Sequence, residues 1–281
     1  MYRIENLFNP KSVALIGATD REGTIGRQLA KNLLLGKDMR KVYAVNPNRE
    51  NVLGLKCFPS ITEVPEHIDL AVIATPAKTV PEIVNECGQS GVDGAVIISA
   101  GFREVGEEGE RLEDEINQFQ EKHGLRILGP NCLGFVRPHA GLNATFLRNN
   151  PKPGEIAFIS QSGALGTAIL DWAVSTHVGF SMFASLGSML NIDFGDLIDY
   201  LGRRACIRDP EVDGIIVIYT PQGTAQPRDL AKKVIKIAEK KLIPILTVWM
   251  GEKEVEGARK LYYAHNIPTF STPEKAVRTY T

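Results

Sequence analysis

The fold is decided by the stretch Val13-Ala14-Leu15-Ile16-Gly17-Ala18-Thr19, which continues after three charged residues into Gly23-Thr24-Ile25-Gly26. A short apolar run ends in small residues, and a helical pattern begins directly behind them. Such a turn lets the free backbone N–H groups and the dipole of the helix N-terminus face one spot, where they favour an anion. The stretch therefore predicts a strand, a phosphate-binding turn and a helix at the start of an α/β domain.

A second turn of the same kind lies past the middle of the chain, at Ile156-Ala157-Phe158-Ile159-Ser160-Gln161-Ser162-Gly163-Ala164-Leu165-Gly166. The chain has 281 residues, of which 43% are hydrophobic and 23% are charged, so it can bury two cores of ordinary size. Two such turns predict two α/β domains, each able to bind an anion.

Charge and cysteine usage narrow the class of protein. A formal net charge of -1 provides no basic field, so neither nucleic acid nor a membrane is predicted as a partner. The four cysteines contain no CxxC pair and indicate reduced thiols rather than a zinc site or a disulfide framework. The N-terminus lacks an apolar signal core, and no apolar run approaches the ~20 residues that span a bilayer. We therefore expect a soluble, cytoplasmic protein.

Up to about residue 135, short β-rich apolar runs alternate with longer helical stretches, which is typical of a parallel sheet. The clearest helices are 81–90 and 107–123, with Gly91 and Gly124 as their C-terminal caps. The expected strands are 12–17, 41–46, 69–75, 94–99 and 126–128.

A break in this pattern lies at residues 149–154, Asn-Asn-Pro-Lys-Pro-Gly, which cannot continue a helix or a central strand. We therefore expect two domains, 1–148 and 149–281. In the second domain the alternation resumes, and a last helix starting at Thr272-Pro273-Glu274 runs to the end of the chain. Its expected strands are 156–159, 181–185, 214–219, 244–249 and 269–271. Because no low-complexity tail follows, we expect the chain to be one piece of a longer protein.

The first turn does not fit a nicotinamide dinucleotide. A nicotinamide dinucleotide site also requires a GxGxxG pattern and an acidic residue at the end of the second strand. Here an irregular segment follows Gly17, and the second expected strand ends in Asn46-Pro47-Asn48. This argues against NAD and for a different phosphate-bearing ligand. The structural alternative is that the glycines only permit a close approach of the helix.

Other strand ends in the first domain also carry small or turn residues. Open parallel sheets bind ligands at the carboxyl ends of their strands. These ends lie at 17–19, 46–48, 75–77, 99–102 and 129–132, and we expect them to line one crevice.

Six segments follow one another in the order expected of a known family. They are Val-Ala-Leu-Ile-Gly-Ala at 13–18, Val-Asn-Pro at 45–47, Ser-Ala-Gly-Phe at 99–102, Gly-Pro-Asn-Cys-Leu-Gly at 129–134, Leu-Asn-Ala-Thr-Phe at 142–146 and Ile-Ser-Gln-Ser-Gly-Ala-Leu-Gly at 159–166. On these segments the chain resembles the NDP-forming acyl-CoA synthetases, relatives of the succinyl-CoA synthetase α chain.

The resemblance implies an α/β fold in which a Rossmann-like CoA-binding domain precedes a flavodoxin-like domain with a doubly wound parallel sheet. It implies CoA or an acyl-CoA as the cofactor, held by Gly17, Ala18, Thr19, Gly23, Ile25, Gly26, Asn46, Pro47, Thr75, Pro76, Ala100, Gly101, Phe102 and Asn131. It also implies a phosphate site at Ser160, Gln161, Ser162 and Gly163, where hydroxyls and backbone N–H groups meet a helix N-terminus. An ordinary N-cap is the structural alternative for Ser162.

One element of the family pattern is missing. The family's phosphohistidine lies in a small-residue loop after the strand matched here by 244–249, and residues 250–260 contain no histidine. His265 stands at a helix end, where a C-terminal cap is the better interpretation. The acidic partner of that histidine also has no clear counterpart in the strand end Tyr219-Thr220-Pro221-Gln222-Gly223. We therefore predict no catalytic residue in this chain.

No metal site is predicted either, because Asp193, Asp196 and Asp199 fall in an amphipathic stretch that is typical of a solvated helix face. Two functions remain open. The first is the CoA-binding α-like portion of a synthetase that converts acyl-CoA, phosphate and NDP into acid, CoA and NTP. It implies an ATP-grasp nucleotide domain or subunit as partner, on the same or a separate chain, and a homo- or hetero-oligomer.

The second function is a CoA-sensing regulatory region of a protein lysine acetyltransferase. Residues 220–222, 249–251 and 267–270 resemble fused proteins of that kind. A nicotinamide enzyme is a third interpretation, which Asn46 disfavours.

Overall fold

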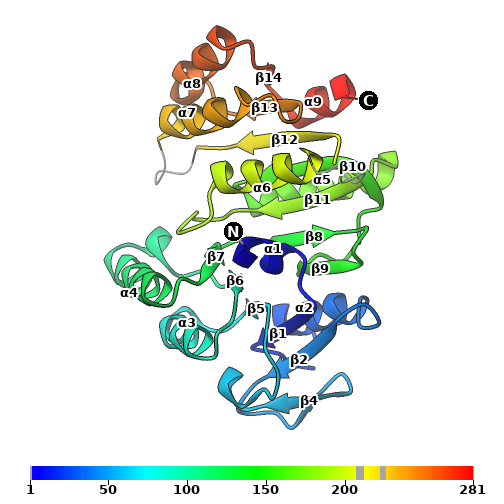
Figure 1. Ribbon diagram of the computed structural model, residues 1–281, viewed down its shortest axis with the longest axis vertical. Helices are drawn as coiled ribbons and strands as arrows, with labels where there is room; N and C mark the ends of the chain where they lie inside the picture. Colours follow the sequence, from blue (N-terminus) through cyan, green and yellow to red (C-terminus); the bar gives the residue numbers. More distant parts are fainter. Residues whose placement is uncertain (1, 207–211, 222–225, 281) are drawn as a thin grey trace. The chain divides into compact units, whose positions relative to one another are not determined.

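The computed structural model describes residues 2–206, 212–221 and 226–280. The chain divides into two compact units, Met1–Asn150 with Gly187–Asn191 and Pro151–Leu186 with Ile192–Thr281. Figure 1 labels their helices and strands. Within the described ranges, no helix combines the length and the apolar character needed to cross a bilayer. The predicted boundary between residues 148 and 149 stays a prediction.

The first unit is built on a seven-stranded sheet in the order β3-β4-β2-β1-β5-β6-β7. All neighbouring strands are parallel except β3 and β4, which pair antiparallel. Its strands are β1 (Ser12–Ile16), β2 (Lys41–Val45), β3 (Asn51–Val52), β4 (Leu55–Phe58), β5 (Leu70–Ile73), β6 (Gly94–Ile97) and β7 (Arg126–Leu128). Its helices are α1 (Tyr2–Phe8), α2 (Ile25–Leu34), α3 (Val80–Gln89) and α4 (Glu107–His123), with 3-10 turns η1 (Ile61–Glu63), η2 (Ala77–Thr79) and η3 (Arg103–Val105).

The strand order of the parallel part, β4-β2-β1-β5-β6-β7, is the Rossmann order. The chain winds from β1 outward to β2 and β4, then returns to the other side of β1 at β5. The order therefore reverses between β1 and β5, and at such a switch point the carboxyl ends of the strands leave a crevice.

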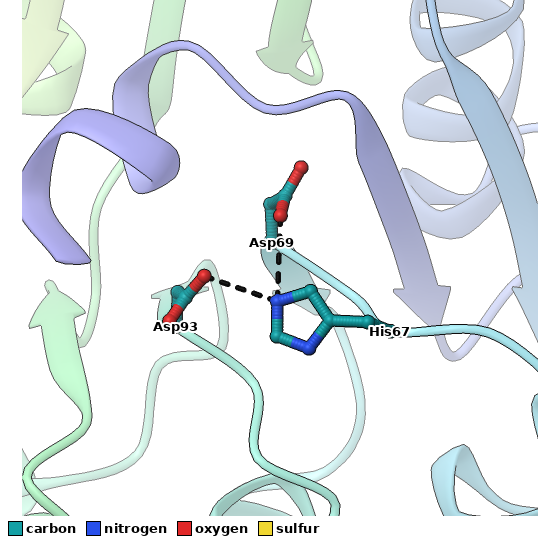
Figure 2. A group of neighbouring side chains, drawn as sticks. All are labelled: His67, Asp69 and Asp93. Atoms are coloured by element: carbon teal, nitrogen blue, oxygen red, sulfur yellow. Dashed lines mark hydrogen bonds and ion pairs between the residues drawn. The ribbon is translucent and has the colours of Figure 1, made fainter. Parts of the chain in front are cut away.

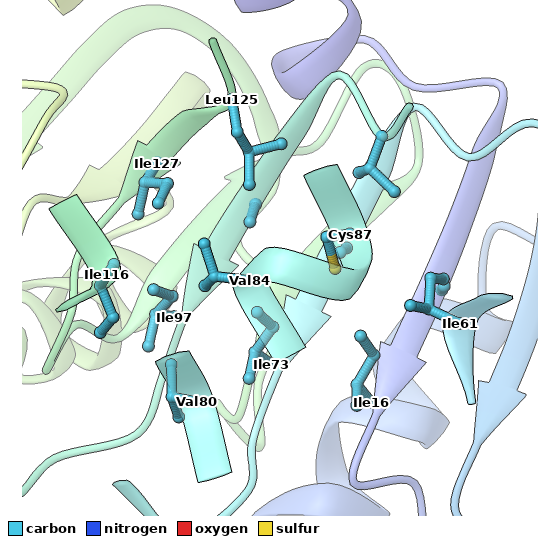
Figure 3. Close-up of a cluster of buried hydrophobic side chains, with 14 of the residues drawn as sticks. Ile16, Ile61, Ile73, Val80, Val84, Cys87, Ile97, Ile116, Leu125 and Ile127 are labelled. Atoms are coloured by element: carbon cyan, nitrogen blue, oxygen red, sulfur yellow. The ribbon is translucent and has the colours of Figure 1, made fainter. Parts of the chain in front are cut away.

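One face of this sheet packs against α3 and α4 (Figure 3). The cluster contains Ile16, Ile73 and Ile97 from three strands, Val84 from α3 and Ile116 from α4, each at most 5% exposed. The strands read as continuous apolar runs because helices cover both faces of the sheet. Helix α1, which the sequence analysis did not predict, contacts β5, β6 and β7.

The first unit also contains an antiparallel hairpin of β8 (Gly134–Arg137) and β9 (Leu142–Thr145). It is anchored to α2 by the buried Asn32, whose amide nitrogen donates to the carbonyl oxygens of Thr145 (2.7 Å) and Leu147 (2.8 Å). The sequence pattern does not predict this hairpin.

In the second unit the parallel strands follow the order β14-β13-β12-β10-β11. This is the flavodoxin-like order, and it reverses between β10 and β12. The strands are β10 (Pro153–Ser160), β11 (Phe180–Ser185), β12 (Gly214–Tyr219), β13 (Ile245–Trp249) and β14 (Thr269–Phe270). The helices are α5 (Gly163–Thr176), α6 (Phe194–Cys206), α7 (Pro227–Ala238), α8 (Lys253–Ala264) and α9 (Pro273–Tyr280).

The first strand of the second unit starts earlier than expected. The sequence predicted a strand at 156–159, whereas β10 begins at Pro153. The strand tolerates proline there because Pro153 is its first residue and the register shifts between Pro153 and Ile156, which removes the need for a regular ladder donor.

The three aspartates around α6 lie where a solvated helix face was expected. Asp193 Oδ1 accepts the backbone N–H groups of Gly195 (2.7 Å) and Asp196 (3.1 Å) before the helix. Asp199 pairs with Arg203 (2.6 Å) and Lys240 (2.6 Å). Asp193 thus caps the start of α6, and Asp199 forms ion pairs on its surface.

Candidate functional site

The first predicted turn lies at the switch point of the first sheet. Gly17 follows β1 with φ +94° and donates its N–H to the Val45 carbonyl (3.0 Å). A Cβ at Gly17 would lie 2.5 Å from the Ala74 carbonyl oxygen behind β5. A Cβ at Gly26 would lie 2.3 Å from the Gly17 carbonyl oxygen. The two glycines therefore allow β1, β5 and α2 to meet more closely than side chains would permit.

The N-terminus of α2 opens at this turn. Thr24 is the N-cap, and its Oγ1 accepts the Arg27 N–H (3.4 Å) while donating to the Arg21 carbonyl (2.7 Å). Gly23 and Ile25 are exposed, and the Ile25 side chain is 47% accessible. A ten-residue helix thus presents its first turn to solvent beside β1, as an anion site requires.

The end of β2 carries an amide where a nicotinamide site has a carboxylate. Asn46 Nδ2 donates to the Ala18 carbonyl (2.8 Å), and its Oδ1 accepts the Asn48 N–H (2.9 Å). Asn46 thereby fixes both the first turn and its own loop, while Pro47 is exposed. Its side chain has no negative charge that would repel a phosphate.

The ends of β5 and β6 are joined by a side-chain hydrogen bond, in which Ser99 Oγ donates to the Thr75 carbonyl (2.6 Å). Pro76 and Ala100 are exposed, whereas the Gly101 N–H donates to Glu104 Oε1 (2.6 Å). The exposed residues border the carboxyl end of the sheet, as the sequence predicted.

Phe102 lies differently from the other predicted site residues. Its side chain is fully buried in the core cluster beneath α4. A Cβ at Gly109 would lie 1.7 Å from the Phe102 carbonyl oxygen, so the backbone is also tightly packed. Phe102 therefore stabilises the loop that follows β6 by packing in the core of the first unit.

The loop behind β7 completes this edge. Its Gly129-Pro130 bond is cis, and the exposed Asn131 has φ +53° and donates its N–H to the Ser99 carbonyl (2.9 Å). Cys132 is buried and donates its thiol to the Ile97 carbonyl (3.3 Å). Burial raises the pKa of the Cys132 thiol to about 12, which leaves it protonated at neutral pH, so Cys132 fills space in the core.

A short segment from a distant part of the sequence secures this loop. The N–H groups of Ser188 and Leu190 donate to the carbonyls of Pro130 (2.9 Å) and Gly129 (3.1 Å). Asn191 Oδ1 accepts the N–H of Ile127 (3.1 Å) on the edge strand β7. Residues 187–191 thus belong structurally to the first unit, and sequence reasoning missed this support.

The second predicted turn lies at the switch point of the second sheet. Ser160 ends β10 and is fully buried, and its Oγ donates to the Ser162 carbonyl (3.0 Å). Ser162 is the N-cap of the fourteen-residue helix α5, with its Oγ accepting the Leu165 N–H (3.3 Å). The hydroxyls of Ser160 and Ser162 thus shape the turn, and Gly163 is half-buried at the first helical position.

Gln161, between the two serines, has an unusual environment. Its backbone N–H donates to the Ile218 carbonyl on β12 (3.3 Å), and its side chain is fully buried. Within the described part of the chain, neither its amide nitrogen nor its amide oxygen has a hydrogen-bond partner. A buried amide without partners costs about 1–3 kcal/mol, so it calls for a polar ligand or water at this turn.

The loop behind β13 carries no histidine. Residues 250–252 connect Trp249 directly to α8, and the Arg259 guanidinium donates to the Trp249 carbonyl (3.0 Å). His265 is the C-cap of α8, as the sequence predicted, and its Nδ1 lies 3.1 Å from Glu239 Oε1. Thr220 and Pro221 follow β12, while Gln222 and Gly223 lie outside the described residues.

Comparisons with known proteins agree with this two-unit construction. Residues 11–138 match the family model of the CoA binding domain, and residues 153–266 match that of the succinyl-CoA ligase like flavodoxin domain. These matches confirm the predicted fold class and CoA as the predicted cofactor class.

Among curated relatives, the ADP-forming acetate–CoA ligase I of Archaeoglobus fulgidus is 42% identical over 89% of this chain and 35% of its own length. The α subunit of the ADP-forming acetate–CoA ligase II of Pyrococcus furiosus is 42% identical over 89% of this chain and 52% of its length. The chain thus spans a third to a half of these relatives.

Among solved structures, the dinucleotide forming acetyl-coenzyme A synthetase 1 of Ca. Korarchaeum cryptofilum, in complex with phosphate and ADP, has a TM-score of 0.86. It is 32% identical, and the match covers 98% of this chain and 61% of that one. The resemblance found in the sequence is therefore confirmed.

Proposed function

Because the chain belongs to the NDP-forming acyl-CoA synthetase family, we propose that it is the α-like portion of such an enzyme and handles the CoA ester and phosphate. CoA or acyl-CoA binds the first unit at the carboxyl ends of β1, β2, β5, β6 and β7. Phosphate binds the second unit at residues 160–163. The observation that carries this proposal is the position of both turns, because each lies where the strand order of its own sheet reverses.

The chemistry proposed for these sites is acyl transfer between CoA and phosphate. A phosphate oxygen attacks the thioester carbonyl, a C–O bond forms, and the C–S bond breaks to release the CoA thiolate and an acyl phosphate. A nucleotide domain of the ATP-grasp type, on the same or a separate chain, then accepts the phosphoryl group onto NDP and leaves the acid. Assembly with that domain, as a homo- or hetero-oligomer, belongs to the proposal.

The chain itself supplies position and charge rather than a nucleophile. The N-terminus of α2 and the Gly17 turn face the pyrophosphate of CoA, and the N-terminus of α5 faces the transferred phosphate. The Gln161 amide offers two N–H donors, and such donors stabilise charge that develops on a phosphate oxygen. The comparisons give no support for the regulatory acetyltransferase alternative.

Calorimetry on the purified chain tests the first half of this proposal. We expect CoA and acetyl-CoA to bind with micromolar-scale dissociation constants and NAD to bind more weakly, because the residue after β2 is Asn46 rather than an acidic residue. Tighter binding of NAD than of CoA would overturn the proposal.

We further expect the chain alone to form no acid-labile phosphohistidine from acyl phosphate or from acyl-CoA plus phosphate. The physical reason is that residues 250–252 lead straight into α8 without a histidine, and that His265 caps this helix beside Glu239. Incubation with radiolabelled phosphate, followed by alkaline and acid washes, measures this directly. If the original chain instead retained the label and His265→Asn lost it, that result would contradict the prediction and identify His265 as the residue that carries the phosphate.

A further inference from the structure

Three side chains with metal-ligating atoms converge at the amino end of the first sheet (Figure 2). Asp69 directly precedes β5, Asp93 directly precedes β6, and His67 lies two residues before Asp69. His67 Nε2 is 3.1 Å from Asp93 Oδ2 and 3.5 Å from Asp69 Oδ1. Among the described residues, these three offer one nitrogen and two oxygen ligands within 4.8 Å of one another.

Hydrogen bonds from neighbouring elements hold both carboxylates in place. Asp69 Oδ2 accepts the backbone N–H groups of Lys11 (2.6 Å) and Ser12 (3.1 Å), which leaves Oδ1 directed at His67. Asp93 Oδ2 accepts the amide of Asn6 on α1 (2.8 Å). In metal sites, hydrogen bonds of this kind orient the carboxylate ligands. Because both carboxylates are already held, a metal ion would not have to order them on binding.

The loop that carries His67 is fixed in the same way. Ser12 Oγ donates to the His67 carbonyl (2.8 Å) and accepts the Asp69 N–H (3.0 Å). One serine thus positions both His67 and Asp69, while the His67 side chain stays 55% exposed. The His67 imidazole is therefore in contact with solvent.

We propose that His67 Nε2, Asp69 and Asp93 form a binding site for a divalent cation of the zinc class. Ligands about 2.0–2.1 Å from a tetrahedral ion lie about 3.3 Å apart, and the two separations from Nε2, 3.1 Å and 3.5 Å, bracket that value. The carboxylate side chains are only 13% and 15% exposed, so a doubly charged ion offsets two partly desolvated negative charges. Water completes the coordination on the open side of His67.

The site is separate from the proposed CoA site. Asp69 and Asp93 stand at the amino ends of β5 and β6, whereas the predicted CoA residues follow the carboxyl ends of the same parallel strands. A bound ion links these strand starts to β1 and, through Asn6, to α1. Its function is structural, since it ties the N-terminal helix to the sheet.

Titration of the metal-free chain with Co²⁺ tests the proposal, because a nitrogen–oxygen ligand set gives visible absorption bands that Zn²⁺ then removes. We expect the bands in the original chain and at least about a tenfold weaker affinity in His67→Asn. His265→Asn is the matched control, because it removes an exposed imidazole that, among the described residues, is paired with the single carboxylate of Glu239, and we expect its affinity to change less than about twofold.

Asp93→Asn is a second variant, which keeps an acceptor for Asn6 and removes one charged ligand, and we expect the same loss as in His67→Asn. We also expect Zn²⁺ to raise the melting temperature of the original chain and not that of His67→Asn. Absence of absorption bands, or equal affinity in the original chain and His67→Asn, would overturn the proposal. It would leave His67 as a simple ion-pair partner of the two aspartates. CoA binding does not depend on either outcome.

Discussion

Gly17→Ala is expected to weaken CoA binding by at least about 100-fold, or about 3 kcal/mol. The added Cβ would lie 2.5 Å from the Ala74 carbonyl oxygen, and the backbone at Gly17 has φ +94°, which side-chain-bearing residues rarely adopt. The Ala74 backbone must therefore move, and the switch point between β1 and β5 widens. Calorimetry with CoA measures the loss of affinity.

Gly54→Ala is the matched control for this substitution, because Gly54 lies in the turn between β3 and β4 and outside the proposed CoA site. Gly54 also has a positive φ, of +84°, but a Cβ there would meet no atom within 4 Å. Gly54→Ala therefore carries backbone strain without the steric clash, and we expect it to retain most of the CoA affinity. Circular dichroism and thermal melting of both variants separate a lost site from a lost fold. Equal CoA affinity in Gly17→Ala and the original chain would remove the first turn from the proposed site.

The sheets and both turns could be predicted because their signals are local. Parallel strands covered on both faces appear in sequence as short continuous apolar runs, and the residues that follow them, such as Gly17 after β1 and Gln161 after β10, are their direct neighbours in sequence. Helix α4 was predicted at its observed bounds because its charged face and its Gly124 cap are both local features.

The elements that were missed depend on contacts far along the chain. Helix α1 has seven residues, and its anchor Leu7 packs on Gly94, where a Cβ would lie 2.6 Å from the Leu7 side chain. Because the two residues are far apart in the chain, no local pattern predicts that Leu7 contacts Gly94. Similarly, Asp93 reaches His67 only because β5 and β6 pair side by side, so no spacing rule joins them in sequence.

The phosphate turn shows a different limit of sequence reasoning. The serines of this turn, residues 160–163, were predicted to bind phosphate because hydroxyls donate hydrogen bonds to phosphate oxygens. In the structure, however, the Ser160 hydroxyl donates to the Ser162 carbonyl, and Ser162 caps α5. The unpartnered polar group is the Gln161 amide between them. Which of three adjacent polar side chains is left without a partner depends on the packing of β10 against β12, and a motif does not contain that information.

Gln161→Met is expected to raise the free energy of unfolding by about 1–2 kcal/mol in phosphate-free buffer and to abolish stabilisation by phosphate. The gain arises because methionine fills a similar volume without a buried amide that lacks hydrogen-bond partners. The loss arises because, in the part of the chain that the structure describes, neither N–H of this amide has a partner, so both are available to phosphate at the N-terminus of α5. Denaturant unfolding with and without added phosphate or sulfate measures both effects.

Gln28→Met is the control of opposite sign. The Gln28 amide nitrogen donates to Asn32 Oδ1 (2.9 Å) and to the Leu147 carbonyl (3.1 Å), so its replacement removes two satisfied bonds and should lower stability by about 1 kcal/mol. Gln28→Met should keep the phosphate response. If Gln161→Met proved as destabilising as Gln28→Met, the Gln161 amide would be hydrogen-bonded in the folded chain without ligand. The turn would then serve only to start α5, because a donor already committed to the protein has no free N–H for phosphate.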